Sequence, residues 1–214
     1  MALVVNVWTK VAVAVQTALA AAKTITAITK ASPAVASSTA HGYTNGQEIK
    51  LSVSGMLEVN NMVLRVANIT ANTFELEGID STLFNTFTSG TAQLITFGAA
   101  AATLQDVNSS GGEAKDIDIT TIHDDTDKLI PGSKSPLSYS FGSLWDPADP
   151  ALLEFKKADN VKGTRCMRFN FSTGAKVYFD AYPSASLAPG GSKGDAVTTP
   201  VSFKLTGPVV AYAS

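Results

Sequence analysis

Hydrophobic and polar residues alternate in short runs along most of the chain, and turn-forming residues separate the runs. Alternation with a period of two is typical of β-strands that bury one face. Pairs such as His41-Gly42, Asn45-Gly46 and Ser89-Gly90 indicate turns between such strands. The pattern predicts strands at residues 24–29, 48–53, 62–69, 73–77 and 91–97. Five short strands at this spacing predict a small barrel or sandwich that folds on its own.

A further alternating run covers residues 116–122. Its period of two places Ile117 and Ile119 on one face and Asp116 and Asp118 on the other. We expect the isoleucine face to belong to the core and the aspartate face to be solvated and negative.

The polar segment after this run, residues 123–136, has the sequence HDDTDKLIPGSKSP. It is too long and too polar for a tight hairpin, so it predicts a mobile loop. Residues 137–144 then resume the strand pattern. Upstream, the turn cluster at residues 108–112 should leave the chain free to bend.

One short helix is predicted after Trp145. Asp146 and Asp149 each precede a proline, which suits an N-cap followed by proline at the first helical position, and the sequence does not decide between them. Leu152, Phe155 and Ala158 would form a narrow apolar stripe that docks on a sheet. Further strands are predicted at residues 166–171, 176–182 and 199–207.

These elements predict a mainly β protein with two units. A small-residue tract at residues 98–103 marks the return from the first unit into a second, larger one. We predict a β-sandwich or barrel-like domain with one flanking α-helix, formed by residues 1–23 and 98–214. Residues 24–97 would be an inserted small β-barrel-like domain.

Composition excludes several classes of function. Of the 214 residues, 45% are hydrophobic and 16% charged, which is ample for a packed core, and the formal net charge is −2. No basic field exists that would neutralise phosphates, so tight nucleic-acid binding is not expected. The single cysteine, Cys166, lies in an apolar alternation and is expected to be a buried thiol.

The start of the chain is rich in valine and alanine without forming a targeting signal. Lys10 interrupts the apolar run, and no small polar cleavage region follows Ala22, so a secretory signal is not expected. Lys10, Gln16 and Lys23 also leave no uninterrupted apolar segment of about 18 residues, so no membrane span is predicted. We expect synthesis in a cytoplasm.

Catalytic and metal-binding motifs are not found in the sequence. His41 and His123 lack companions at zinc spacing and are expected to be ordinary loop residues. Asp124, Asp125 and Asp127 lack the glycine and terminal glutamate of a calcium loop, which favours a solvated acidic loop. We therefore expect no cofactor, no metal and no enzymatic activity.

Five motifs follow one another in the second unit: residues 116–124 (DIDITTIHD), Leu129-Ile130-Pro131-Gly132, Tyr139-Ser140-Phe141, Trp145-Asp146-Pro147 and residues 200–207. Their order closely resembles the major tail tube protein of long-tailed, non-contractile bacteriophages. This resemblance covers most of residues 1–23 and 98–214. It implies a virion protein whose hexameric rings stack into a tube through which the genome passes. Implied partners are other copies of the chain, the tape-measure protein, and the tail terminator and tip proteins.

Residues 24–97 resemble a different family. Five short motifs are similar to the small β module named after the first catalytic-cysteine half-domain of ubiquitin-activating enzymes, which is found in phage virion proteins. They are His41-Gly42, Gly46, Gly55, Asn72-Thr73-Phe74 and Leu76-Glu77-Gly78. These residues include no cysteine, so the resemblance implies only an appended β module, expected on the tube exterior.

Three candidate surfaces follow from these observations. A bore must let DNA slide without capture, and carboxylates repel phosphate, so Asp116 and Asp118 are candidate lining residues. In the resembled family the long polar loop contacts neighbouring rings and becomes ordered on assembly. The corresponding candidates are His123, Asp124, Asp125, Asp127, Lys128, Leu129, Ile130 and Pro131. The apolar N-terminal segment, residues 4–22, could be an intersubunit surface or an ordinary core strand, and its candidates are Val5, Val7, Trp8, Val11 and Val13.

Two other classes of function remain open from sequence. A surface- or carbohydrate-binding β-protein would use the inserted domain, with Tyr43, Phe84 and Phe87 holding the ligand. A hydrolase would need pairs of Asp and Glu residues that sequence alone does not bring together.

Overall fold

The computed structural model describes residues 5–213, in which strands dominate and α1 (Pro150–Asn160) is the one α-helix. The mainly β class with a single helix is therefore confirmed. Up to the middle of the chain the elements are β1 (Ala12–Leu19), β2 (Lys23–Ile25), β3 (Ala27–Ile28), β4 (Ala34–Ser37), β5 (Glu48–Ser54), the 3-10 helix η1 (Leu57–Val59), β6 (Val63–Ala67), β7 (Thr73–Leu76) and β8 (Ser89–Ala101). The later strands are β9 (Leu104–Ser110), β10 (Ala114–Asp118), β11 (Leu129–Lys134), β12 (Ser138–Leu144), β13 (Arg165–Asn170), β14 (Lys176–Ser184), β15 (Thr198–Leu205) and β16 (Val210–Tyr212).

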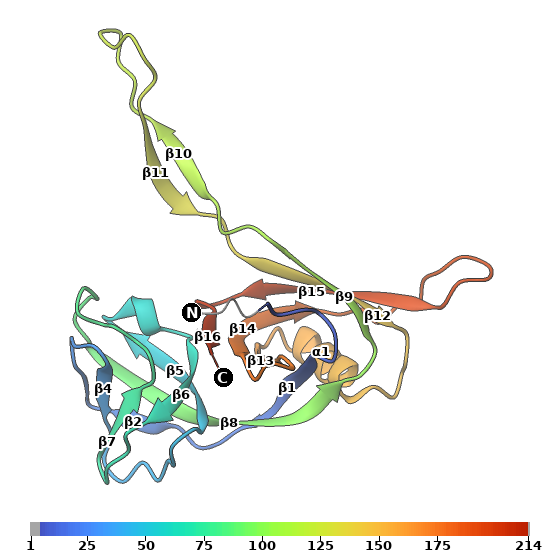
Figure 1. The fold of residues 1–214 in the computed structure, drawn as a ribbon, viewed down its shortest axis with the longest axis horizontal. Coiled ribbons are helices and arrows are strands. Elements are labelled where there is room, and N and C mark those ends of the chain that lie inside the picture. The colour runs from blue at the N-terminus through green and yellow to red at the C-terminus, as the bar shows by residue number, and fades with distance from the viewer. Residues whose placement is uncertain (1–4, 214) are drawn as a thin grey trace.

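Antiparallel pairing joins most of these strands into one sheet. The hydrogen-bonded order is β3-β4-β7-β6-β5-β8-β1-β13-β14-β15-β12-β9, with β2 added to β8 and β16 added to β14. The strands β10 and β11 pair only with each other and project from the body (Figure 1). No helix among residues 5–213 combines the length and apolarity needed to cross a membrane.

Two clusters of buried side chains form the core. One lies within residues 25–95 but also includes Cys166, Tyr178, Val210 and Tyr212 from the later strands. The other lies between the strands β1, β12, β13, β14 and β15 and the helix α1. Cys166 is fully buried, as its alternating sequence predicts.

Helix α1 begins at Pro150 because Asp149 caps it. The Asp149 carboxylate accepts hydrogen bonds from the backbone N–H groups of Ala151 (2.8 Å) and Leu152 (3.0 Å), which satisfies donors that the first turn leaves free. The predicted apolar stripe is confirmed, since Leu152, Phe155 and Ala158 are all buried.

Strand β8 crosses the predicted boundary at residues 97 and 98. Its first half pairs with β5, from Ser89 opposite Ser54 to Leu94 opposite Ile49. Its second half pairs with β1, from Ile95 opposite Leu19 onward. The small-residue tract therefore continues the strand as far as Ala101, and one strand holds both groups of strands together.

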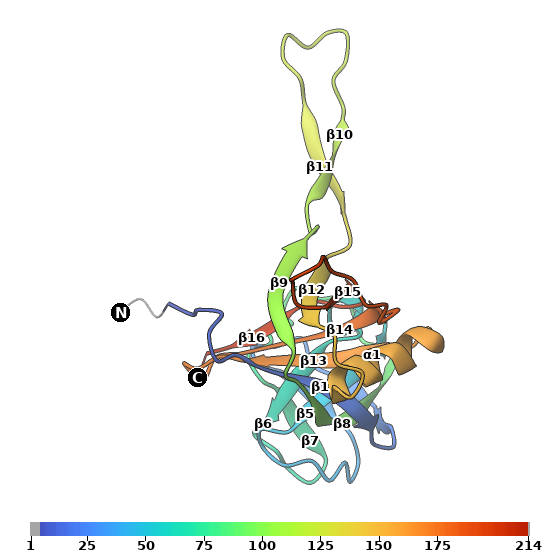
Figure 2. The same ribbon diagram turned by 90° about the vertical axis from the view of Figure 1, so that its right-hand side faces the viewer.

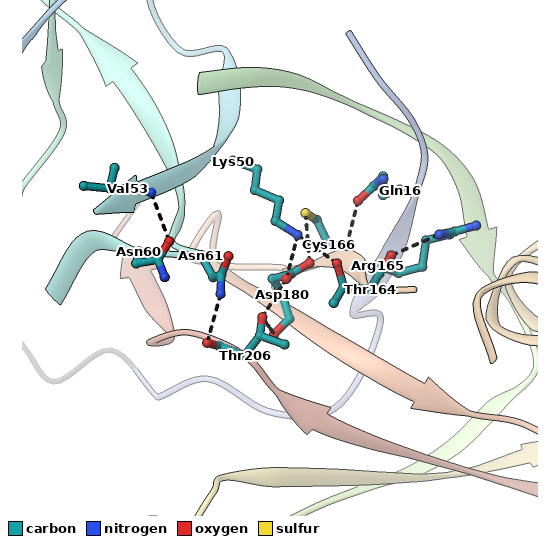
Figure 3. Close-up of polar contacts among 10 residues, drawn as sticks. All are labelled: Gln16, Lys50, Val53, Asn60, Asn61, Thr164, Arg165, Cys166, Asp180 and Thr206. Carbon is teal, nitrogen blue, oxygen red and sulfur yellow. Dashed lines mark hydrogen bonds and ion pairs between the residues drawn. The ribbon is translucent and has the colours of Figure 1, made fainter. Parts of the chain in front are cut away.

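A buried ion pair joins β5 to β14 beside this shared strand (Figure 3). Lys50 Nζ lies 2.7 Å from Asp180 Oδ2, and the Asp180 side chain is only 1% exposed. Lys50 also donates to Thr164 Oγ1 at 2.8 Å, and the Thr206 hydroxyl donates to Asp180 Oδ2 at 2.6 Å. Both charges are therefore compensated by several partners rather than by a single contact.

A second polar contact lies nearby on the same strands. Glu48 accepts from Arg168 Nη1 at 2.7 Å and from the Tyr178 hydroxyl at 3.0 Å. Burial raises the pKa of Tyr178, so this hydroxyl remains a neutral donor. Arg65 lies 4.2 Å from the ring centroid of Tyr212, whose hydroxyl accepts the Arg65 backbone N–H at 3.1 Å.

Asp149→Ala should lower the free energy of unfolding by about 2–3 kcal/mol, because it removes the cap and leaves buried donors unpaired. The partly buried Ala102 N–H and Thr103 hydroxyl would also lose their bonds to the second carboxylate oxygen. Asp146→Ala is the matched control and should change stability by less than about 0.5 kcal/mol. Denaturant unfolding measures both, and equal effects would contradict this assignment of the cap.

Lys50→Met should destabilise the protein by about 3–5 kcal/mol, because it leaves the Asp180 carboxylate buried without its cation. The double variant Lys50→Met with Asp180→Leu should be less destabilised than the sum of the single variants. The exposed pair Lys162 and Asp159 provides the control, since Lys162→Met should cost under about 1 kcal/mol. Additive effects at Lys50 and Asp180 in denaturant unfolding would refute the coupling.

Candidate self-assembly surfaces

The strands β10 and β11 form a two-stranded arm that continues from β9 and β12 (Figure 2). Backbone hydrogen bonds carry the ladder across its base, from Gly112 N to Ser135 O (3.2 Å) and from Ser135 N to Glu113 O (2.8 Å). The arm is therefore a continuation of the body's outermost strand pair.

Glycines mark the base of the arm, at the predicted turn cluster. Gly111 and Gly112 have φ values of +87° and +84°, a conformation that L side chains rarely adopt. A Cβ atom on Gly111 would also lie 2.2 Å from the Pro136 carbonyl oxygen. Only glycine allows the two backbone segments to approach this closely at the point where the sheet continues into the arm.

Two predictions about this region are wrong. Residues 129–134, which the sequence suggests are part of a mobile loop, form β11 and pair with β10, in which Asp118 lies opposite Leu129. Ile117 and Ile119 do not belong to a core, because their side chains are 49% and 46% exposed. The alternation is real, but nothing in the described chain covers either face.

The register gives the arm two different faces. Ile117 lies opposite Ile130, which is 44% exposed, so both isoleucines share one face. Gly132 lies under Ile117, since a Cβ there would be 2.9 Å from Ile117 Cδ1. Asp116 and Asp118 lie on the opposite face, where both are solvent-exposed and pair with Pro131 and Leu129, which is 55% exposed. The arm therefore has an isoleucine face and a mixed face with two aspartates, which we call the acidic face.

The acidic tip of the arm is closed by its own hydrogen bonds. Asp124 forms an ion pair with Lys128 and accepts from the backbone N–H of Thr121 at 2.9 Å. These contacts, Lys128 first, lower the pKa of Asp124, and hydrogen bonds from Thr120 lower that of Asp118. Among residues 5–213, every side-chain hydrogen bond of the tip stays within the arm.

Most of the remaining loop candidates lie in the tip between β10 and β11, where His123, Asp125 and Asp127 are exposed. Pro131 is also exposed but lies within β11, opposite Asp116. The structure thus brings the predicted loop residues together on one projecting element. The second strand could not be predicted from local patterns, because a proline and a glycine interrupt it and prolines are confined to edge positions of sheets.

The N-terminal candidates divide into two groups. Val5, Val7 and Trp8 are exposed, whereas Val13 is buried in the core and belongs to β1. Trp8 rests on the rings of Phe169 and Phe171, with centroids 5.6 and 5.4 Å away. Trp8 and Val11 also line a groove of about 180 Å³ whose other wall is the free edge of β9. Residue 4 lies outside the described range.

The residues expected of a carbohydrate-binding site do not form an open platform. Tyr43 is buried, its hydroxyl donates to the Ala92 carbonyl at 2.9 Å, and burial raises its pKa to about 12. Phe84 and Phe87 are half-buried against the same core.

His41 is not the plain loop residue that the sequence suggests. It is buried, its Nε2 lies 3.0 Å from the Thr70 carbonyl oxygen, and its Nδ1 accepts the Tyr43 N–H. Among the described residues, no group of three His, Cys, Asp or Glu side chains is placed to hold a metal ion.

A mainly β chain with an uncovered projecting arm has the features of a structural subunit that assembles with further copies. A family model described as phage tail tube protein, TTP, matches residues 54–214, about three quarters of the chain. The chain belongs to this phage tail tube protein family, and its role is that of a structural tail component that assembles into a tube. No match is found among curated proteins. The family match begins at the end of β5, within the predicted insertion.

Proposed function

We propose that the chain forms hexameric rings that stack into the tube of a long, non-contractile phage tail, and that this tube conducts DNA into the host cell. One observation carries the proposal beyond family membership. The arm exposes Ile117, Ile119 and Ile130 on one face, and none of residues 5–213 covers them.

The energetics of the arm favour contact with another copy. A two-stranded ribbon is marginally stable alone, because neither of its faces is packed against a core. Burying a large aliphatic side chain completely contributes about 1.5–3 kcal/mol of favourable free energy. Covering three half-exposed isoleucines would therefore contribute a substantial part of the free energy of association. We propose that a neighbouring subunit covers this face, while the acidic tip, His123 to Lys128, provides polar contacts at the rim.

The rest of the proposal concerns the arrangement around the tube. Residues 1–23 and 98–214 would form the tube wall, and residues 24–97 would be the inserted module on the exterior. Val5, Val7 and Trp8 offer a second exposed apolar contact between subunits. The tape-measure, terminator and tip proteins are the expected tail partners.

The proposal includes no enzymatic step and no cofactor. DNA would pass without sequence-specific binding, in keeping with a formal net charge of −2. Synthesis in the host cytoplasm would precede assembly into the virion.

Hydrogen exchange on the free subunit and on the assembled tube tests the role of the arm. Amides of β10 and β11 should exchange quickly in the subunit and become protected in the tube, because assembly covers the ribbon. Amides of β13 and β14 should be protected in both states and serve as the internal control. Equal protection of the arm in both states would defeat the proposal.

Replacing Asp116 and Asp118 with lysine tests whether the acidic face lines the bore. Tubes should still assemble, since both side chains are exposed, and genome delivery should slow because lysines retain phosphate. Asp116→Lys and Asp118→Lys are also made one at a time. Asp195→Lys, on an exposed loop, changes the charge by the same amount as either single variant and is their control. Unchanged infectivity would count against the lining role, and loss of tubes would assign these residues to assembly instead.

A further inference from the structure

Four strands at one end of the large sheet, β14, β15, β12 and β9, have one bare face. Their other face belongs to the core, where Phe141, Val201 and Phe203 lie beneath α1. Figure 1 shows α1 on that side of the strands. Residues of the opposite face are exposed or half-exposed along β9, β12 and β15 and at the end of β14, residues 182–184. Farther back on β14 the same face is covered, since Tyr178 and Asp180 are buried.

The bare face carries a row of short polar side chains. Ser140 lies opposite Asn108 on one side and Ser202 on the other, and Ser202 lies opposite Ser184. Directly paired residues of antiparallel strands share a face, so these four side chains form a continuous row across four strands. All four are exposed. We call the surface around this row the serine face.

The two neighbouring rows extend the same surface. On one side the row contains Ser110, Ser138, Lys204 and Tyr182. On the other side the row contains Asp106, Gly142 and Pro200.

Only two residues in these three rows are charged, Asp106 and Lys204, and a hydrogen bond holds Asp106 against the sheet. The Asp106 carboxylate accepts the Gly142 backbone N–H at 2.9 Å. A Cβ on Gly142 would lie 2.5 Å from this carboxylate, so the absence of a side chain lets Asp106 lie across the strand. Lys204 is the single cation. The face is therefore hydrophilic and carries little charge. A hollow of about 290 Å³ opens on it beside Ser140, Ser184 and Ser202, and Asp159 also lines this hollow.

Neither an outer surface nor a subunit interface has this composition. Soluble protein surfaces are about 25–35% charged, with both signs mixed, which is more than this face contains. The centres of interfaces are rich in aromatic and aliphatic side chains, whereas Tyr182 is the one large side chain with an apolar body here. A wet surface with little charge suits the wall of an aqueous channel.

We infer that the serine face lines the bore of the tube and is part of the surface past which DNA moves. Hydroxyl groups remain hydrated and do not displace counterions from phosphates, so they hold a passing duplex weakly. A wall of lysines would bind it, and a wall of large apolar groups would offer water no hydrogen bonds. The inference rests on the proposed function and adds to it the residues of the wall. The face ends at the Ser110–Ser138 pair, next to the base of the arm.

Cysteine accessibility in assembled tubes tests the inference. Ser140→Cys and Ser202→Cys are nearly isosteric replacements at exposed positions, and the single native cysteine, Cys166, is buried and gives little background. Each variant is treated with a small maleimide and with a maleimide on a polymer too bulky to enter the bore. Dissociated subunits of the same variants are the control and should react with both reagents.

In tubes, the small reagent should label both positions by entering through the open ends, and the bulky reagent should label neither. Labelling by the bulky reagent would place the face outside, and protection from both reagents would place it between subunits. Either result overturns the inference while leaving the tube intact. Failure of the unaltered chain to form tubes would instead overturn the proposed function, and this inference with it.

Discussion

Hydrogen bonding along β8 is the constraint on which the rest of the subunit depends. One strand of 13 residues pairs with β5 in its first half and with β1 in its second half. The two groups of strands cannot rotate against each other without breaking this ladder. The buried pair of Lys50 and Asp180 adds a contact that is favourable in one relative position only, because separating its charges leaves each uncompensated in the interior.

The arm is organised in the opposite way. Its hydrogen bonds are local, its two faces differ in polarity, and within residues 5–213 no core supports it. Buried side chains are therefore unevenly distributed, with the core in the body and little packing in the ribbon. Such a division suits the assembly that we propose, in which the body keeps its fold and the arm gains contacts with other copies.

Local sequence patterns predicted the features that depend on residues close together in the sequence. The capped helix with its stripe of Leu152, Phe155 and Ala158 follows from a period of 3.6, and the burial of Cys166 follows from strand alternation. The choice of Asp149 over Asp146 could not be predicted, because it depends on donors at residues 102 and 103 that are distant in sequence.

Predictions failed where burial or pairing depends on segments that are distant in the sequence. Alternation at Ile117 and Ile119 correctly separates two faces, but it cannot reveal whether another element covers one of them. The strand β8 and the ion pair of Lys50 with Asp180 depend on contacts between distant segments. The serine face could not be recognised from sequence either, because its rows appear only when the register of four strands is known.

The most direct test of self-assembly through the arm is an electron-microscopy reconstruction of the particles that this chain forms by itself. It should show closed rings stacked into a tube, with each subunit body unchanged and each isoleucine face of the arm packed against a neighbouring copy. Particles in which the arms stay uncovered, or a chain that remains monomeric at high concentration, would contradict the central claim.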